Sequence, residues 1–216
     1  AGDWGAFAIL GEIYYRNGGG RRDFNIEPPK SSVHRKNYGS DDLGDMNHVA
    51  PMVKMLWQLP TRRNMVVEVK YAYEKNNYNQ SYAGQTTVDF DANPHQQYVG
   101  YQLGEYNTEH HTSYAKFRAD INNNITNTTT GYLNYFTRDW FKLDKVISGG
   151  TTCSLETVVS KVATGNCLAG LGILKGSTAG QLRYKGNDRK YGAYGIMNET
   201  DFKFNTNIFG KNIGHA

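Results

Sequence analysis

Apolar and polar residues alternate with a period of two along much of this chain. The alternation is clearest over 67–73, which reads Val-Glu-Val-Lys-Tyr-Ala-Tyr, and over 115–121, which reads Ala-Lys-Phe-Arg-Ala-Asp-Ile. Successive side chains of a strand point to opposite faces of its sheet, so both segments are predicted to be half-buried strands. Gly and Asn turns separate the candidates. About a dozen strands are expected, the others at 5–15, 51–59, 84–90, 97–106, 131–136, 141–143, 168–174, 181–186, 191–197 and 202–208.

One segment, near 154–164, has helical spacing instead, because its apolar residues fall at 155, 158, 159 and 162. Ser154 is placed to cap the first turn, and Gly165 is placed to end the helix. The sequence therefore predicts one short helix in an otherwise β-rich chain.

These elements predict a single all-β domain over 1–216, an antiparallel β-sandwich or jelly roll of about a dozen strands. A chain of 216 residues with 24 Gly and 16 Tyr suits sheets and turns. A long basic loop is expected at 16–47, and the polar tract 122–130 is expected to be a turn. Such a loop is longer than most loops of compact domains, which indicates a functional or gripping role.

A chain can span a membrane either with helices or with a sheet. No apolar run is long enough for a transmembrane helix. A membrane-spanning sheet of the outer-membrane type also alternates apolar and polar residues. We set it aside here because of the helix, the cysteine pair, and a candidate strand at 97–106 that puts polar residues on both faces.

Net charge gives little indication of a partner. The formal charge is +4, which is low for a dedicated nucleic-acid binder, so no specific nucleic acid is expected. The local excess of Arg and Lys lies in the 16–47 loop, which is interpreted as a solvated basic loop.

Cys153 and Cys167 are the two cysteines of the chain. Their spacing favours a disulfide that closes a short loop around the predicted helix, whereas a zinc site would need further Cys or His ligands nearby. Four N-x-[ST] triplets, at Asn79, Asn124, Asn127 and Asn198, add weak support for export. A secreted or extracellular location is therefore expected.

The densest set of metal-type ligands is Asp89, Asp91, Asn93 and His95, at alternate positions before and after Pro94. Hard cations such as calcium take several carboxylate, amide and carbonyl oxygens, so these four residues are the predicted metal ligands, with a polar turn as the alternative. It is not an EF-hand, because Gly100 stands where that loop needs Glu. A second acidic group at 41–48 is a weaker candidate.

The segment 88–101, Val-Asp-Phe-Asp-Ala-Asn-Pro-His followed by Tyr98-Val-Gly-Tyr, resembles the metal loop of legume-type, concanavalin-A-like lectins. The resemblance implies a sandwich fold in which Asp89 and Asp91 ligate metal. It also implies that Asn93 completes a calcium site and that His95 lies near a transition metal. The loop is shorter than the family's and lacks a further Asp.

Surface recognition of a glycan or cell-surface carbohydrate, without catalysis, is the function expected from these features. Aromatic rings present apolar faces to sugars while Asn and Asp take hydroxyl hydrogen bonds. The expected ligand-binding residues are Trp57, Tyr78, Tyr98 and Asn93.

Two other classes stay open. A self-assembling subunit of a capsid, pilus or fibre would use edge strands to form a homo-oligomer or larger assembly. A polysaccharide lyase or hydrolase would use His110, His111, Tyr114 and Arg118, or Glu105 with Glu109 or Glu68. No catalytic motif of the commonest enzyme classes is present, so no catalytic residue is assigned.

Overall fold

The computed structural model describes residues 6–19, 23–24, 46–79, 82–160, 165–208 and 211–215. These residues are mostly antiparallel β-sheet, with 66% in strands and 13% in short helices. The strands are β1 (Ala6–Gly18), β2 (Asp23–Phe24), β3 (Met46–Gln58), β4 (Met65–Asn79), β5 (Gln96–Gln97), β6 (Glu105–Asn122), β7 (Ile125–Ser148), β8 (Thr151–Ser154), β9 (Gln181–Gly186), β10 (Arg189–Phe202), β11 (Phe204–Ile208) and β12 (Lys211–His215).

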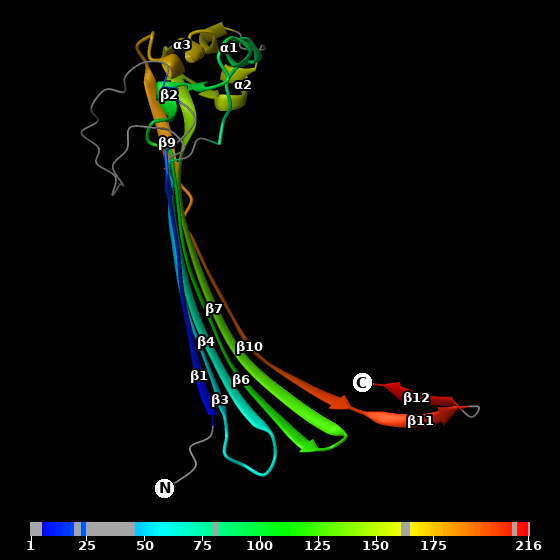
Figure 1. Ribbon diagram of the computed structural model, residues 1–216. Coiled ribbons are helices and arrows are strands. Elements are labelled where there is room, and N and C mark those ends of the chain that lie inside the picture. The colour runs from blue at the N-terminus through cyan, green and yellow to red at the C-terminus, as the bar shows by residue number, and fades with distance from the viewer. Residues whose placement is uncertain are drawn as a thin grey trace.

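One sheet dominates the molecule. Its strands follow the order β1-β3-β4-β6-β7-β10, while β8 and β9 pair with the upper part of β7. All these pairings are antiparallel. The strands form a tall, curved sheet with a cluster of helices, the head, at one end and tight turns at the other (Figure 1). We call these the head end and the turn end.

The head contains the helices α1 (Thr87–Ala92), η1 (Val99–Tyr101), α2 (Leu155–Val159), η2 (Gly165–Cys167) and α3 (Gly170–Lys175). Its hydrophobic core is made of residues that are far apart in the chain, from η1 at one extreme to α3 at the other. The buried members are Tyr98, Tyr101, Leu143, Val146, Cys153, Leu155, Val158, Ile173 and Leu174. A side chain at Gly100 would meet the backbone of Leu174 at 2.8 Å, so glycine lets η1 approach α3 closely. The hydrophobic core of the described residues is therefore in the head.

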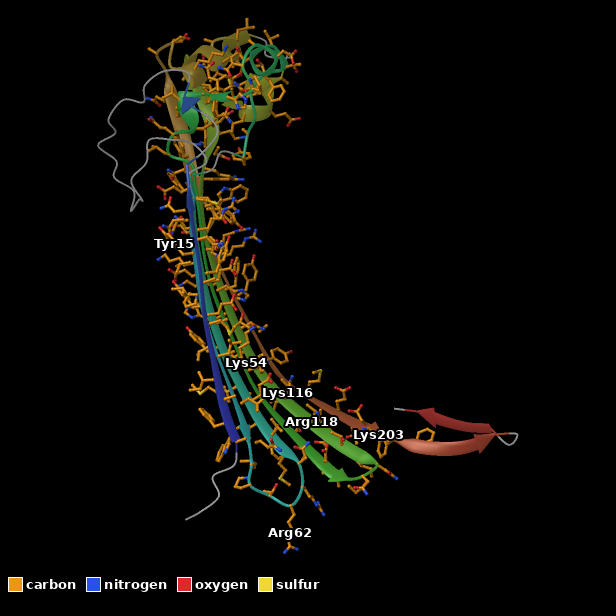
Figure 2. The ribbon with its side chains drawn as sticks, viewed as in Figure 1. Tyr15, Lys54, Arg62, Lys116, Arg118 and Lys203 are labelled. Carbon is orange, nitrogen blue, oxygen red and sulfur yellow. A yellow bond between two sulfur atoms is a disulfide. The ribbon has the colours of Figure 1, made fainter. Side chains whose placement is uncertain are left out.

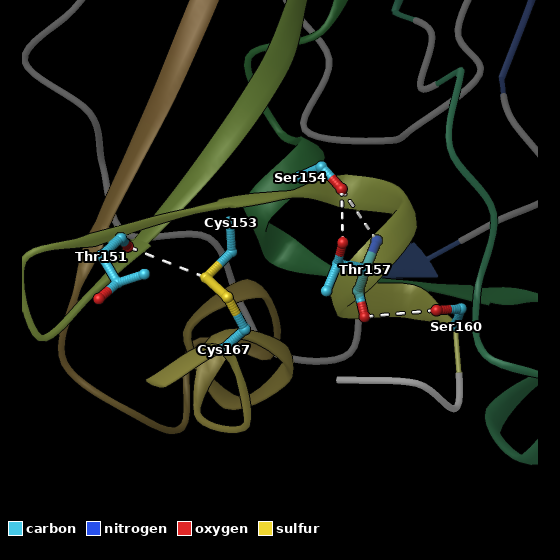
Figure 3. The surroundings of a disulfide bond; sticks show 6 residues. All are labelled: Thr151, Cys153, Ser154, Thr157, Ser160 and Cys167. Atoms are coloured by element: carbon cyan, nitrogen blue, oxygen red, sulfur yellow. Dashed lines mark hydrogen bonds between the residues drawn. A yellow bond between two sulfur atoms is a disulfide. The ribbon is translucent and has the colours of Figure 1, made fainter. Parts of the chain in front are cut away.

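A disulfide between Cys153 and Cys167 closes the head, as the sequence predicts (Figure 3). It joins the end of β8 to η2. Ser154 caps α2 as expected, since its Oγ accepts a hydrogen bond from the Thr157 amide at 3.1 Å. The helix is shorter than the predicted 154–164, because the backbone leaves helical geometry at Ser160, and residues 161–164 lie outside the described residues.

Several strand predictions are wrong, and all of those failures lie in the head. The segments 84–90 and 168–174 contain α1 and α3, and 97–106 contains the end of β5, η1 and only the start of β6. Short apolar runs fit a strand and a buried helical turn equally well, so periodicity could not separate them. The tract 122–130 is also not one long turn, because β7 begins at Ile125 and the turn occupies only two residues.

The long strands exceed their predicted lengths. The predicted strands 131–136 and 141–143 are parts of the 24-residue β7, and all but the last residue of 51–59 lies in β3, which starts at Met46. The strands continue toward the head through polar residues, because the backbone of those residues still pairs with the neighbouring strands. Most of the predicted 16–47 loop, including the acidic residues at 41–45, lies outside the described residues.

The large sheet is open, with no second sheet over either face among the described residues. The antiparallel all-β class is as predicted, while the second layer of a sandwich is not confirmed. Each of the two edge strands, β1 and β10, is paired along one side only in the described sheet.

Candidate functional site

One face of the large sheet carries a continuous apolar surface. The pairing register places on it the residues that occupy odd positions of β1, β3, β4, β6 and β7 and even positions of β10. We call this the apolar face and the opposite one the polar face. The central row across the apolar face is Ile9, Met55, Val69, Ala115, Gly131 and Ile196.

No Asp, Glu, Lys or Arg interrupts the apolar face between the row of Phe7 and the row of Ile13 in the six described long strands. Several of its side chains are widely open to solvent, including Ile13 at 72% and Ile196 at 81% exposure. A contiguous apolar surface of this kind is a sign of an interaction surface, since isolated exposed apolar residues are ordinary but a large patch is not.

Aromatic side chains border this surface at both ends. Phe7, Trp57 and Phe117 lie in one row toward the turn end. Toward the head end, Tyr73, His111 and Tyr135 share a row, and the Tyr71 hydroxyl lies 2.8 Å from His111 Nδ1. The central row of the apolar face is therefore aliphatic, and the rows on either side of it carry aromatic residues.

Charge returns to this face immediately beyond the tyrosine border. The first charged pair there is Lys75 and Glu109, whose Nζ and Oε1 atoms are 2.9 Å apart. Residues Asn47, Asn77 and Asn107 lie farther toward the head. The change from apolar to charged residues is abrupt along β4 and β6.

The polar face carries charges in the same rows where the apolar face has none. Glu68 accepts a hydrogen bond from the Tyr114 hydroxyl at 2.6 Å and pairs with Lys54 at 3.2 Å and Lys116 at 3.8 Å. Lys54 on β3 and Lys116 on β6 come from the two strands that flank β4, and both are labelled in Figure 2. The Tyr114 hydrogen bond, helped by the two lysines, lowers the pKa of the Glu68 carboxyl. The sheet thus separates a charged, hydrated side from an apolar side.

The second organised cluster surrounds Asp89 in the head. Lys175 Nζ lies 2.7 Å from Asp89 Oδ1, while the hydroxyls of Tyr98 and Thr86 donate to Oδ2 at 2.6 and 2.7 Å. Burial acts to raise the pKa of this carboxyl, but the three hydrogen bonds outweigh burial and the pKa is lowered. The cluster joins α1, the residue before η1, and the end of α3.

Acid is expected to weaken the head through Asp89. A carboxyl whose pKa is lowered by folding contributes stability above its unfolded pKa, about 3.9, and loses that contribution as pH falls through the folded pKa. Asp89→Asn should lower the free energy of unfolding of the head by about 1 kcal/mol at pH 7. It should also flatten the loss of stability between about pH 5 and pH 2. Near-UV circular dichroism melts over this range measure both effects.

Asp91→Asn is the matched control for that experiment, because Asp91 is exposed on the same helix. It should leave both the pH 7 stability and the acid response unchanged. Parallel loss of stability with acid in the wild type and in Asp89→Asn would show that another carboxyl is responsible.

Of the four predicted metal ligands, Asp89 is already held by protein hydrogen bonds. Asp89 lies in α1 and both of its carboxylate oxygens hold protein hydrogen bonds. Asp91 and His95 are exposed, and Asn93 ends α1, with its side chain accepting a hydrogen bond from the His95 amide at 3.0 Å. Among the described residues no group of three or more acidic, His or Cys side chains is placed to hold a metal. A calcium site stays a prediction.

The predicted glycan-binding residues do not converge. Trp57 is on the apolar face at the turn end, paired with Val67, whereas Tyr78 is on the polar face at the head end of the same sheet. Tyr78 lies eleven positions after Val67 in the same strand, a distance of about 37 Å. Tyr98 is buried, with 1% exposure, and its hydroxyl serves Asp89.

The residues considered for catalysis are also divided between the two faces. His111 and Glu109 lie on the apolar-face side of β6, while His110, Tyr114 and Arg118 lie on the other side. Glu68 is on the polar face with Tyr114, whereas Glu105 shares the side of Glu109. The sheet therefore places His110 and His111 on opposite faces and also separates Glu105 from Glu68, whereas Glu105 and Glu109 share a face.

Comparison with known proteins adds no family assignment, since no family model, curated protein or solved structure matches this chain. Within the described residues, no helix has the length and apolarity needed to cross a membrane.

Sequence reasoning missed the apolar face as a site because it treated each alternating segment as the inner half of a sandwich. The signal was nevertheless present. The alternating segments place aromatic residues at the ends of apolar stretches, as with Phe7 in β1, Trp57 in β3 and Tyr73 in β4. Only alignment of these segments side by side turns them into two borders.

Proposed function

We propose that the large sheet is a membrane-embedded wall whose apolar face contacts lipid hydrocarbon and which holds the disulfide-closed head at one membrane surface. The observation that carries the proposal is the apolar face itself, exposed, free of charged residues between its aromatic borders, and backed by a charged face. Of the three features that weighed against such a sheet in the sequence, the strand at 97–106 is absent from the structure, while the short helix and the disulfide both lie in the head, at one end of the sheet.

The dimensions suit a bilayer. On β4 the charge-free part of the apolar face runs from Met65 to Tyr73, which is nine residues, or about 27 Å of strand at roughly 3.4 Å per residue. A membrane-spanning strand needs about nine to eleven residues. Aromatic residues favour the two membrane interfaces, where an amphipathic ring meets both hydrocarbon and water.

The two edge strands of the sheet, β1 and β10, would need further hydrogen-bond partners in a bilayer. Backbone groups that lack hydrogen bonds in hydrocarbon cost several kcal/mol each. The outer sides of β1 and β10 must therefore pair with further strands, from this protein or from another copy. The assembly predicted from sequence enters here as edge-to-edge pairing.

Neighbouring residues on β10 give a direct test. Ile196 and Met197 lie on opposite faces and are 81% and 57% exposed. We expect a bimane fluorophore on Ile196→Cys, in the full chain in bilayers, to be strongly quenched by lipids brominated at mid-chain. The same label on Met197→Cys should be quenched by aqueous iodide instead.

The alternative is that a second protein layer covers the apolar face, as in the predicted sandwich. In that case the label at Ile196→Cys would be shielded from both quenchers. Equal lipid quenching at the two positions would contradict the proposal as well, since the two faces would then be equivalent. Glycan recognition stays a prediction of the sequence.

A further inference from the structure

The turn end of the sheet carries a basic cleft between the β3–β4 turn and the β6–β7 turn. The cleft has a volume of about 970 Å³ and opens to solvent. Four cationic residues line it (Arg62, Arg63, Arg118 and Lys203), together with several Asn side chains. Figure 2 shows Arg62 at the tip of its turn, with Arg118 on β6 and Lys203 between β10 and β11.

Asp120 joins the two turns. Its carboxylate accepts hydrogen bonds from Asn64 Nδ2 and Thr126 Oγ1, each at 2.9 Å, and its amide donates to the Asn64 carbonyl at 3.0 Å. The Asn64 hydrogen bond, then that of Thr126, lowers the pKa of this carboxyl. The walls of the cleft are therefore tied together by a carboxylate whose two oxygens are already used.

The remaining charge in the cleft is strongly positive. Arg118 pairs with Asp120, with an N–O distance of 3.7 Å. No acidic side chain of the described residues lies within ion-pair distance of Arg62, Arg63 or Lys203, and Asp120 is the only acid among the lining residues. Four cations against one carboxylate leave a net charge of about +3 at neutral pH.

We infer that this cleft binds a phosphate group. Arginine presents a planar fork of donors that matches phosphate oxygens, and lysine adds a point charge. The Asn side chains supply further donors, and the lining is mostly polar. Phosphate carries enough negative charge to balance the three cations that Asp120 does not pair.

The phosphate has two possible sources, a lipid headgroup or a free phosphate compound. Phe117 and Trp57 border the apolar face at this same end, so a lipid headgroup would lie near the cleft if the sheet is embedded in a bilayer. The inference itself does not depend on the membrane proposal, because the cleft is complete in the described residues.

Calorimetric titration of the full chain in nonionic detergent tests the inference. The two probes are inorganic pyrophosphate and dihexanoyl phosphatidic acid, the latter below its micelle concentration. Binding of either probe at low salt is expected, and the combined variant Arg62→Gln, Arg63→Gln, Lys203→Gln should weaken it at least tenfold. Tighter binding of the lipid would assign the site to headgroups, and tighter binding of pyrophosphate to free phosphates.

The matched control removes three positive charges outside the cleft, with Lys70→Gln, Lys145→Gln and Lys190→Gln. It should change the affinity less than twofold. The inference is overturned if neither probe binds, or if the control weakens binding as much as the cleft variant, since net charge alone would then explain it. Either result leaves the quenching test of the apolar face intact.

Discussion

Ile9→Lys should prevent most of the stable folding of the chain into bilayers, whereas Leu10→Lys should not. The two residues are neighbours on β1 and lie on opposite faces, with exposures of 63% and 53%. Lysine on the lipid-facing side near the bilayer centre costs about 2–4 kcal/mol, which is roughly 30- to 900-fold in the folding equilibrium. On a hydrated face a surface substitution usually changes stability by less than about 0.5 kcal/mol.

The measurement is the free energy of unfolding of each variant in phosphatidylcholine vesicles, from urea titrations followed by tryptophan fluorescence. Both side chains are similarly exposed in the isolated sheet. If both faces contacted water, the two substitutions would therefore change the free energy of unfolding by small and equal amounts. Equal effects would therefore contradict the lipid contact. A loss at Ile9 that persists without any lipid would instead indicate a covering protein layer.

Removal of the disulfide is expected to have the second large effect, confined to the head. Cys153 and Cys167 are 14 positions apart, and closing a loop of that size contributes about 3 kcal/mol by restricting the unfolded chain. The double variant Cys153→Ser, Cys167→Ser should lower the protection of head amides against hydrogen exchange by a factor of about 150. Amides in the middle of β4 and β6 should keep theirs.

Reduction of the wild type provides the control for this prediction. A phosphine reductant should reproduce the loss in the wild type and leave the double variant unchanged. The locality follows from the structure, since Cys153 belongs to the buried head cluster and the long strands continue far beyond it. Loss of protection throughout β4 and β6 would show that head and sheet unfold as one unit.

Much of the sheet could be predicted from the sequence, because strand periodicity is a local property. The alternation at 67–73 and 115–121 identifies β4 and β6, and each side chain already has its face assigned by its position. The Cys153–Cys167 pair and the Ser154 cap could be predicted for the same reason, since each depends on residues close together in the chain.

The head was predicted poorly because its elements are short and its order comes from distant contacts. Asp89 is the clearest case. Its spacing with Asp91, Asn93 and His95 suggested a metal loop, but Lys175, 86 positions away, reaches its carboxylate in the folded chain. No local pattern contains that partner.

The sequence by itself determined the strand class, the disulfide and the two chemically different sides of each strand. Only the tertiary structure decided that these sides form one uncovered apolar face and one charged face, and that two remote turns meet in a basic cleft. The physical reason is that periodicity fixes which way a side chain points, whereas strand order and register fix what it lies beside. The apolar face, its aromatic borders and the basic cleft each consist of residues from several strands, so they depend on which strands lie side by side.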